Sequence, residues 1–304
     1  MKVAVTGATG TIGSAVVEQL KLRGDEVTVL SRDPVRARDA LPGADAHAWG
    51  DPAAEPAPAE ALAGRDAVVH LLGEPVNRRW SDEARQRIRA SRVDGTRNLV
   101  GGLRRADPRP GVLVSQSASG YYGARGDERV DESEPVARGD FLAEVVAAWE
   151  AEARKAAELG VRVVTTRTGV VLSPEGGALA KMLPPFKLGV GGPVAGGRQY
   201  VPWIHIEDVA GALLHVLDSA AAEGPVNITA PEPATNRELS KALGRVLRRP
   251  AIAPVPGLAV KLLYGEMSSI VTTGVRAVPV RLLELGYEFK HPELEEALRA
   301  ALGR

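Results

Sequence analysis

The feature that most constrains the fold is a glycine-rich turn near the start of the chain. The run Thr6-Gly7-Ala8-Thr9-Gly10-Thr11-Ile12-Gly13 joins the apolar segment 3–5 to the amphipathic segment 11–22. Between a strand and a helix, the first glycine permits a tight turn, the second lets the backbone approach a diphosphate, and the third lets helix and strand pack closely. Backbone N–H groups at the helix start then face the phosphates. We therefore predict a diphosphate-binding site formed by Gly7, Gly10, Thr11, Ile12 and Gly13.

The first half of the chain alternates short apolar segments with longer amphipathic ones. Residues 27–30, 67–72, 112–115 and 161–166 are predicted strands, and residues 81–105 and 140–158 are predicted helices. Continuous apolar strands are typical of a sheet covered on both faces, and strands that alternate with helices pair in parallel. We expect an α/β fold of the Rossmann type, which is a doubly wound parallel sheet.

The second half of the chain differs in composition and in the spacing of its apolar residues. Residues 173–203 are rich in glycine and proline with little periodicity, whereas 205–218 and 226–228 indicate a helix and a strand that return to the sheet. The remaining predicted elements are helices at 235–248, 257–266, 275–285 and 293–302. We expect a Rossmann domain of residues 1–172 plus about 204–230, and a smaller, mainly helical, substrate-covering part of residues 173–203 and 231–304. A ligand cleft between the two is the usual arrangement.

Composition excludes several classes of function. Lysine plus arginine and aspartate plus glutamate both number 38, so no net charge favours a nucleic-acid partner. Cysteine is absent, which excludes disulfides, thiol nucleophiles and cysteine-ligated metals. The five histidines lack ligand spacing, so no metal site is predicted. With neither a long apolar run nor the pattern of a signal peptide, we expect a cytoplasmic protein without a membrane partner. The oligomeric state is not predicted.

The end of the second predicted strand indicates which dinucleotide binds. An acidic residue there suits the ribose hydroxyls of NAD, whereas arginine suits the 2′-phosphate of NADP. Ser31 and Arg32 occupy this position, so we predict NADP(H), although Asp33 would repel a phosphate if it faced inward. The alternative is that Arg32 is a solvated loop residue.

Several runs beyond the glycine turn resemble a known family. They include His70-Leu71-Leu72-Gly73-Glu74, Ser117-Ala118-Ser119-Gly120-Tyr121-Tyr122-Gly123, Arg167-Thr168-Gly169-Val170-Val171-Leu172, Lys181-Met182-Leu183-Pro184-Pro185-Phe186 and Trp203-Ile204-His205-Ile206. Over essentially its whole length the chain resembles atypical extended short-chain dehydrogenases/reductases, the "epimerase family proteins" of the NAD-dependent epimerase/dehydratase superfamily that carry a C-terminal domain of unknown function.

The resemblance implies an NADP(H)-binding Rossmann domain with a small cap. It implies cofactor contacts at Gly10–Gly13, Ser31, Arg32, Leu71, Leu72, Arg92 and Val171. Leu71, Leu72 and Val171 would also be core residues in any parallel sheet, and Arg92 could be one more charge on a helix face.

The catalytic pattern of the superfamily is missing. Its Tyr-x-x-x-Lys pair is absent, and alignment on Trp149-Glu150 places Leu142 and Val146 at those positions. Without the lysine, a tyrosine acting as a base near neutral pH needs roughly 4 kcal/mol of help from another positive group. The candidate substitutes are Ser117, Tyr121, Tyr122 and His205.

Three functions remain open. The first is an NADP(H)-dependent oxidoreductase acting on an unknown small molecule by a non-standard proton route. The second is a non-catalytic NADP(H)-binding sensor or structural protein, which the missing pair favours. The third is a sugar-nucleotide epimerase or dehydratase. Fold alone does not choose between them, because function depends on the site.

Overall fold

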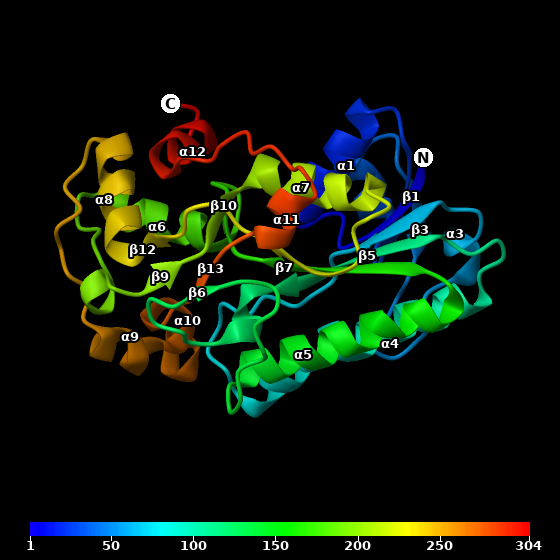
Figure 1. The fold of residues 1–304 in the computed structure, drawn as a ribbon, viewed down its shortest axis with the longest axis horizontal. Helices are drawn as coiled ribbons and strands as arrows, with labels where there is room; N and C mark the ends of the chain where they lie inside the picture. Colours follow the sequence, from blue (N-terminus) through cyan, green and yellow to red (C-terminus); the bar gives the residue numbers. More distant parts are fainter.

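A computed structural model describes residues 1–304 and has a seven-stranded parallel sheet at its centre (Figure 1). The strand order is β11-β7-β5-β4-β1-β2-β3. The strands are β1 (Lys2–Thr6), β2 (Glu26–Ser31), β3 (Asp45–Ala48), β4 (Ala67–His70), β5 (Val112–Ala118), β7 (Arg162–Thr168) and β11 (Gly224–Ile228). The order reverses between β1 and β4, and a crevice for a ligand opens beyond the carboxyl ends of strands at such a point. The predicted Rossmann-type fold is confirmed.

Helices cover both faces of this sheet (Figure 1). On one face α1 (Thr11–Leu22) packs against α7 (Ile206–Asp218), and on the other α4 (Asp82–Arg105) packs against α5 (Phe141–Arg154). Side chains alternate along a strand, so β1 supplies Val3 and Val5 to one core cluster and Ala4 to the other. This double burial explains why the strands are continuous apolar runs.

The second half builds a smaller, mainly helical part with its own core. Helices α6 (Gly177–Lys187), α8 (Asn236–Leu247) and α12 (Leu294–Ala301) share a cluster of 14 buried residues. The short helices α9 (Gly257–Tyr264) and α10 (Ser269–Thr272) follow α8 along the chain. Three two-stranded pairs complete this region: β8 (Val170–Leu172) with β10 (Trp203–His205), β9 (Tyr200–Val201) with β12 (Ala234–Thr235), and β6 (Arg129–Val130) with β13 (Arg276–Ala277). No helix in the structure has both the length and the apolar character needed to cross a membrane.

One helix was not expected from the sequence, and one predicted helix is wrong. Residues 177–187 form α6 although the segment contains Pro184 and Pro185, because the helix buries Leu179, Leu183 and Phe186 along one face. The predicted helix at 275–285 is instead strand β13 followed by the short helix α11 (Val280–Glu284). Elements α2 (Pro34–Ala40), β3 and α3 (Ala59–Leu62) were not predicted.

Candidate functional site

The glycine turn adopts the geometry that its spacing predicts. Gly7 has a φ of +66°, which favours glycine, and an added Cβ there would lie 2.6 Å from the Leu71 carbonyl oxygen. A Cβ at Gly13 would lie 2.2 Å from the Gly7 carbonyl oxygen, so α1 approaches the turn as closely as a glycine allows. Gly10 is the N-cap of α1 and no side chain caps the helix. The N–H groups of its first turn are therefore available to an anion.

A cavity of about 350 Å³ lies beyond the carboxyl ends of β1, β2 and β4. Of the residues expected to bind the cofactor, it brings together Gly7, Gly10, Ser31, Arg32, Leu71 and Leu72. Sequence reasoning missed Arg36, which lies one turn into α2 and lines the same cavity. Arg32 and Arg36 are both exposed, and neither guanidinium has a hydrogen-bond or ion-pair partner within the protein.

Asp33 lies between these two arginines, and its carboxylate is engaged by the backbone. It is the N-cap of α2, and its Oδ1 accepts the Arg36 N–H at 3.0 Å. A carboxylate at a helix N-terminus is partly neutralised by the helix dipole. The repulsion of a phosphate considered from the sequence is correspondingly weakened.

A buried chain of hydrogen bonds supports the floor of this cavity. The Leu71 N–H donates to Thr6 Oγ1, Thr6 Oγ1 lies 2.7 Å from His70 Nδ1, and His70 Nε2 lies 2.9 Å from Thr96 Oγ1. Burial lowers the pKa of His70 to about 3, so the ring is neutral and accepts at one nitrogen while it donates at the other. These hydrogen bonds fix the position of Leu71, at the start of the loop that follows β4.

The remaining expected cofactor contacts lie outside the lining of this cavity. Thr11, Ile12 and Gly13 form the start of α1 behind Gly10, and Val171 packs against the apolar core of the sheet. Arg92 donates to the Glu74 carbonyl at 2.9 Å and stacks over Trp149, with a pKa lowered by burial to about 10. Through this hydrogen bond, Arg92 stabilises the loop after β4.

A second cavity, of about 210 Å³, lies beyond β5, the neighbour of β4 in the sheet. Its lining comes from the residues after β5, the start of α5, and parts of α6, β9, α8 and α10. Leu142, which aligns with the missing catalytic tyrosine, lines it, while Val146 is buried. The two cavities thus follow the same edge of the sheet, as the two halves of a dinucleotide and its substrate require.

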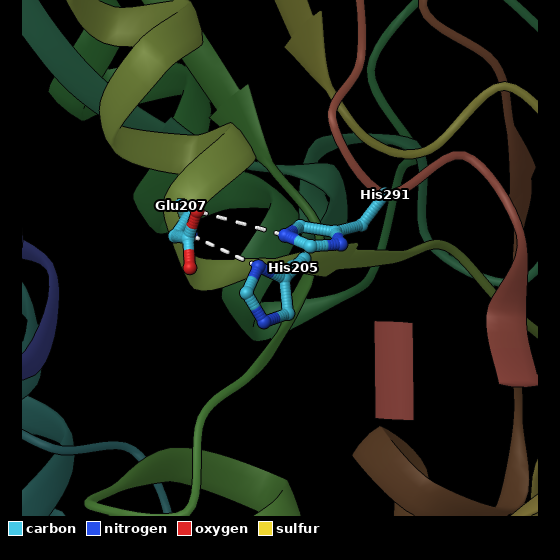
Figure 2. A group of neighbouring side chains, drawn as sticks. All are labelled: His205, Glu207 and His291. Carbon is cyan, nitrogen blue, oxygen red and sulfur yellow. Dashed lines mark hydrogen bonds and ion pairs between the residues drawn. The ribbon is translucent and has the colours of Figure 1, made fainter. Parts of the chain in front are cut away.

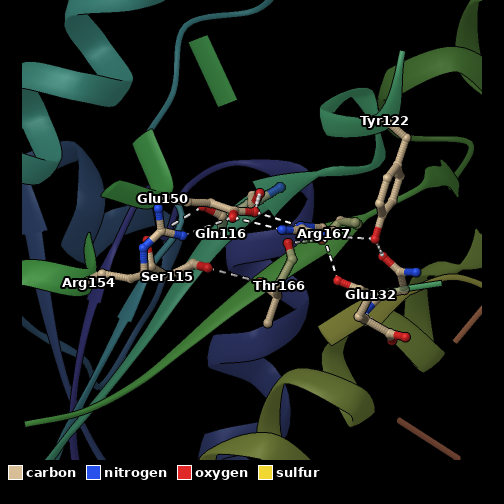
Figure 3. A network of polar contacts seen from close by, with 11 residues as sticks. Ser115, Gln116, Tyr122, Glu132, Glu150, Arg154, Thr166 and Arg167 are labelled. Carbon is tan, nitrogen blue, oxygen red and sulfur yellow. Dashed lines mark hydrogen bonds and ion pairs between the residues drawn. The ribbon is translucent and has the colours of Figure 1, made fainter. Parts of the chain in front are cut away.

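Two of the proposed catalytic residues, Ser117 and Tyr122, belong to a buried polar network. Figure 3 shows Tyr122, Glu150 and Arg167 of this network. Ser117 Oγ donates to Glu150 Oε1 at 2.6 Å, and Arg167 makes a two-point ion pair with Glu150 at 2.8 and 3.0 Å. Tyr122 receives a hydrogen bond from Arg167 at 3.0 Å and donates to Asn227 Oδ1 at 2.8 Å. Both Ser117 and Tyr122 are fully buried. They link strands and helices, and neither hydroxyl faces the second cavity.

Burial raises the pKa of Tyr122 to about 12, which is a further reason against a role as a base. Tyr121 is half-buried, and the Arg167 guanidinium lies 3.6 Å from its ring centroid. Tyr121 lines neither cavity, so the structure does not bring it to the cleft either.

His205 lies in a cluster with Glu207 and His291 whose side-chain ligand atoms are all within 4.8 Å of one another (Figure 2). Its Nδ1 accepts the Glu207 N–H at 3.2 Å and so caps α7. Burial and His291 lower the pKa of His205 to about 4, so the ring is neutral and carries its proton on Nε2. Neither nitrogen can bind a metal while the cap persists. The geometry gives His205 a capping role in place of the chemical role considered from the sequence.

Several polar side chains that sequence reasoning did not select line the second cavity, and three of them have a donor without a partner. These three are Ser119 in the turn η1 (Ser119–Tyr122), Tyr200 in β9 and Asn236 at the start of α8. The hydroxyls of Ser119 and Tyr200 have no partner in the protein, and Asn236 uses only its Oδ1, which accepts the Val194 N–H at 2.8 Å. Ser119 and Tyr200 fall in or beside motifs that carried the family resemblance, which is the one signal that could have found them.

Comparisons with known proteins agree with this geometry. The family model described as "NAD dependent epimerase/dehydratase family" matches residues 3–229, and that of a domain of unknown function (DUF1731) matches residues 255–301. An epimerase family protein SDR39U1 homolog from Arabidopsis thaliana, named as chloroplastic, is 41% identical over 99% of this chain and 87% of its own length. The Homo sapiens epimerase family protein SDR39U1 is 37% identical over 98% of this chain and 99% of its own.

A solved structure extends the comparison. The crystal structure of human epimerase family protein SDR39U1 (isoform2) with NADPH superposes with a TM-score of 0.89 at 36% identity, and the match covers 100% of both chains. Because the Arabidopsis relative is named as chloroplastic, a cytoplasmic location for this chain stays a prediction.

Proposed function

This chain belongs to the NAD-dependent epimerase/dehydratase family, and from that premise we propose that it binds NADPH and uses it as an oxidoreductase of a small molecule. The observation that carries the proposal is the uncapped start of α1, which opens on a cavity bordered by the two unpaired guanidinium groups of Arg32 and Arg36. Backbone N–H groups suit a diphosphate, and guanidinium groups suit the additional 2′-phosphate. The human relative crystallised with NADPH supports the same choice of cofactor.

The residues present fit a dinucleotide along the whole edge of the sheet. Gly7 and Gly13 let the turn and α1 pack closely, because a Cβ at either position would meet backbone atoms. Gly10, which lines the cavity, presents no side chain to a diphosphate there. When bound, NADPH would supply a hydride at its nicotinamide ring. Leu71 and Leu72 line the first cavity and would contact the cofactor, and the mainly apolar walls of the second cavity would surround the reacting groups.

The missing Tyr-x-x-x-Lys pair is less serious for reduction than for oxidation. A phenol that acts as a base must first lose its proton, whereas a phenol that donates a proton to a forming alkoxide starts in its ordinary neutral state. The Tyr200 hydroxyl is unpartnered and lines the second cavity, and the Arg276 guanidinium stacks 5.1 Å from its ring centroid. We therefore assign Tyr200 as the proton donor of a reductase.

One observation favours the alternative of a sensor without turnover. Leu142 and Val146 occupy the positions of the missing pair, and both are apolar. A sensor and a reductase would bind NADPH alike, so they differ only in consumption of the cofactor. An epimerase or dehydratase of sugar nucleotides is a third candidate, and it depends most on the missing tyrosine.

Calorimetric titration with NADPH and NADH tests the cofactor site. We expect Arg32→Ala to raise the Kd for NADPH at least tenfold and the Kd for NADH less than twofold, because only NADPH carries the 2′-phosphate. The matched control is Arg89→Ala, which removes an exposed arginine of α4 outside the cavity and should leave both constants unchanged. Equal losses for both dinucleotides would refute the phosphate-binding role of Arg32.

Loss of NADPH absorbance across a panel of aldehydes and ketones tests the oxidoreductase. Steady consumption that is reduced 10²-fold or more in Tyr200→Phe supports the proposal, since that variant keeps the ring and loses only the hydroxyl. The matched control is Tyr264→Phe, which changes a tyrosine that is 45% exposed and lines neither cavity. Tight NADPH binding without consumption of any carbonyl compound would favour the sensor.

A further inference from the structure

The second cavity is mainly apolar, and this limits what it can bind. Among its walls are Leu142, Val170, Met182, Leu239, Ile270 and Val275. At about 210 Å³ it is smaller than the roughly 300–1,000 Å³ of most ligand pockets. A ligand that fills it must therefore be small and must present mostly apolar surface.

No lysine or arginine lines this cavity. Its one carboxylate, that of Asp140, is the N-cap of α5, and its Oδ1 accepts the Ala143 N–H at 2.9 Å. The nearby Arg276 guanidinium lies against the Tyr200 ring and is not part of the lining. An anionic ligand would lose its hydration without gaining a charged partner, which is costly in an apolar site. The two negatively charged phosphates of a sugar nucleotide would each have the same unfavourable desolvation.

Few of the polar side chains in the lining have a free hydrogen-bond donor. The hydroxyls of Ser269 and Thr273 donate to backbone carbonyls. The donors left without a partner are the Ser119 hydroxyl, the Tyr200 hydroxyl and the Asn236 amide Nδ2. Each of the three can donate a hydrogen bond to an oxygen acceptor. Such a set suits one carbonyl oxygen at the end of an apolar molecule.

We propose, building on the function proposed above, that the substrate is a small, uncharged and largely apolar aldehyde or ketone, and that sugar nucleotides are excluded. The carbonyl carbon receives the hydride from NADPH, and the π electron pair of the C=O bond moves to its oxygen. That oxygen takes the proton of the Tyr200 hydroxyl, and the tyrosinate is reprotonated by an H⁺ from the solvent. One carbonyl compound, one NADPH and one H⁺ are consumed, and one alcohol and one NADP⁺ are formed. Ser119 and Asn236 position the oxygen.

Binding of unreactive probes tests this inference without turnover. The protein saturated with NADP⁺ is titrated calorimetrically with benzamide, benzoate and UDP-glucose. Benzamide and benzoate have nearly the same shape, and they differ in charge. We expect benzamide to bind at least tenfold more tightly than benzoate, and UDP-glucose to give no heat. Benzoate or UDP-glucose binding as tightly as benzamide, or no heat from any probe, would overturn the inference.

A variant in the wall provides the reciprocal test. Met182→Lys places an ammonium group on α6 at the cavity, and Met182 is only partly buried, so the helix should tolerate the change. We expect the ratio of benzamide to benzoate affinity to fall at least tenfold. An unchanged ratio would show that the probes bind elsewhere. Titration of the wild-type protein with NADPH separates the two proposals. If the wild type does not bind NADPH, the proposed function is refuted. If it binds NADPH but benzoate or UDP-glucose binds as tightly as benzamide, only the proposed substrate class is refuted.

Discussion

At the scale of single residues, Gly13 is where the turn leaves least space. A Cβ there would lie 2.2 Å from the Gly7 carbonyl oxygen and 2.7 Å from the Ala8 Cα, and both are backbone atoms that cannot rotate away. We expect Gly13→Ala to displace the turn, raise the Kd for NADPH at least tenfold and lower the free energy of unfolding by about 1–3 kcal/mol. Calorimetry and urea unfolding measure the two effects.

Gly101→Ala in α4 is the matched control. Its added Cβ would lie 3.7 Å from the Pro56 Cβ, an ordinary contact. Alanine is better than glycine in a helix interior by up to about 1 kcal/mol, so stability should be unchanged or higher, and NADPH affinity should not change. Similar losses in both variants would contradict the special role of Gly13.

The residues found from the sequence are those fixed by their neighbours along the chain. Gly7 and Arg32 directly follow the ends of β1 and β2, and Gly13 belongs to the same glycine turn, so local spacing suffices to place them. Tyr200 and Asn236 reach the second cavity only because β9 pairs with β12 and α8 follows directly. Such convergence depends on tertiary packing, which no local pattern contains.

At the scale of secondary-structure elements, the ion pair of Glu150 and Arg167 joins α5 to β7. The Arg167 and Glu150 side chains are 3% and 0% exposed. Glu150→Gln would leave the Arg167 charge buried without its counter-ion, so we expect a loss of about 3–5 kcal/mol in the free energy of unfolding. Urea unfolding measures this loss.

Two further variants separate the cost of a lone charge from the value of the pair. Glu83→Gln removes a partner of Arg87 in an exposed pair of α4 and should cost less than about 1 kcal/mol. Replacing both buried partners, as Glu150→Leu with Arg167→Met, should recover much of the loss because no unpaired charge remains. Equal losses in Glu150→Gln and Glu83→Gln would rule out this interpretation.

Elements whose apolar residues recur at a regular spacing were predicted from the sequence, and elements in which that spacing is interrupted were missed. The helix 11–22 is found with the same bounds, because nothing interrupts its apolar face. Helix α6 contains two prolines and follows a glycine-rich segment, and its stability comes from packing that the sequence does not display. Strand β13 has two residues and exists only through its pairing with β6, so it leaves no periodic signal.

At the scale of the whole molecule, the end of the chain contributes to both cores. Leu282 of α11 joins the core of the sheet, whereas Leu298 of α12 joins the core of the smaller part. Between them, the Tyr287 hydroxyl lies 3.1 Å from Asp208 Oδ1 at the start of α7. A sequence pattern distinguishes helix from strand and does not say which core a helix joins. The return of α11 to the core of the sheet was therefore not predicted.

Two buried histidines make the stability of the whole fold depend on pH. The pKa of His70 is lowered to about 3 and that of His205 to about 4, in both cases mainly by burial, whereas a histidine in the unfolded chain titrates near 6.5. Below pH 6.5 the unfolded chain therefore binds protons that the native protein does not. The contribution of these two histidines to the free energy of unfolding is fully present above pH 6.5. It falls as the pH is lowered toward 4, by up to about 1.4 kcal/mol per pH unit for each group.

His205→Asn isolates one of these groups, because asparagine can still cap α7 and does not titrate. Between pH 7 and pH 5 the free energy of unfolding should fall by about 2 kcal/mol less in His205→Asn than in the wild type. Urea unfolding at the two pH values gives the difference. His47→Asn is the matched control, since His47 lies at the surface beside Asp45 and its replacement should leave the wild-type fall in place. The same fall in His205→Asn as in the wild type would mean that His205 is not held neutral by the fold, and the capping geometry of α7 would then need revision.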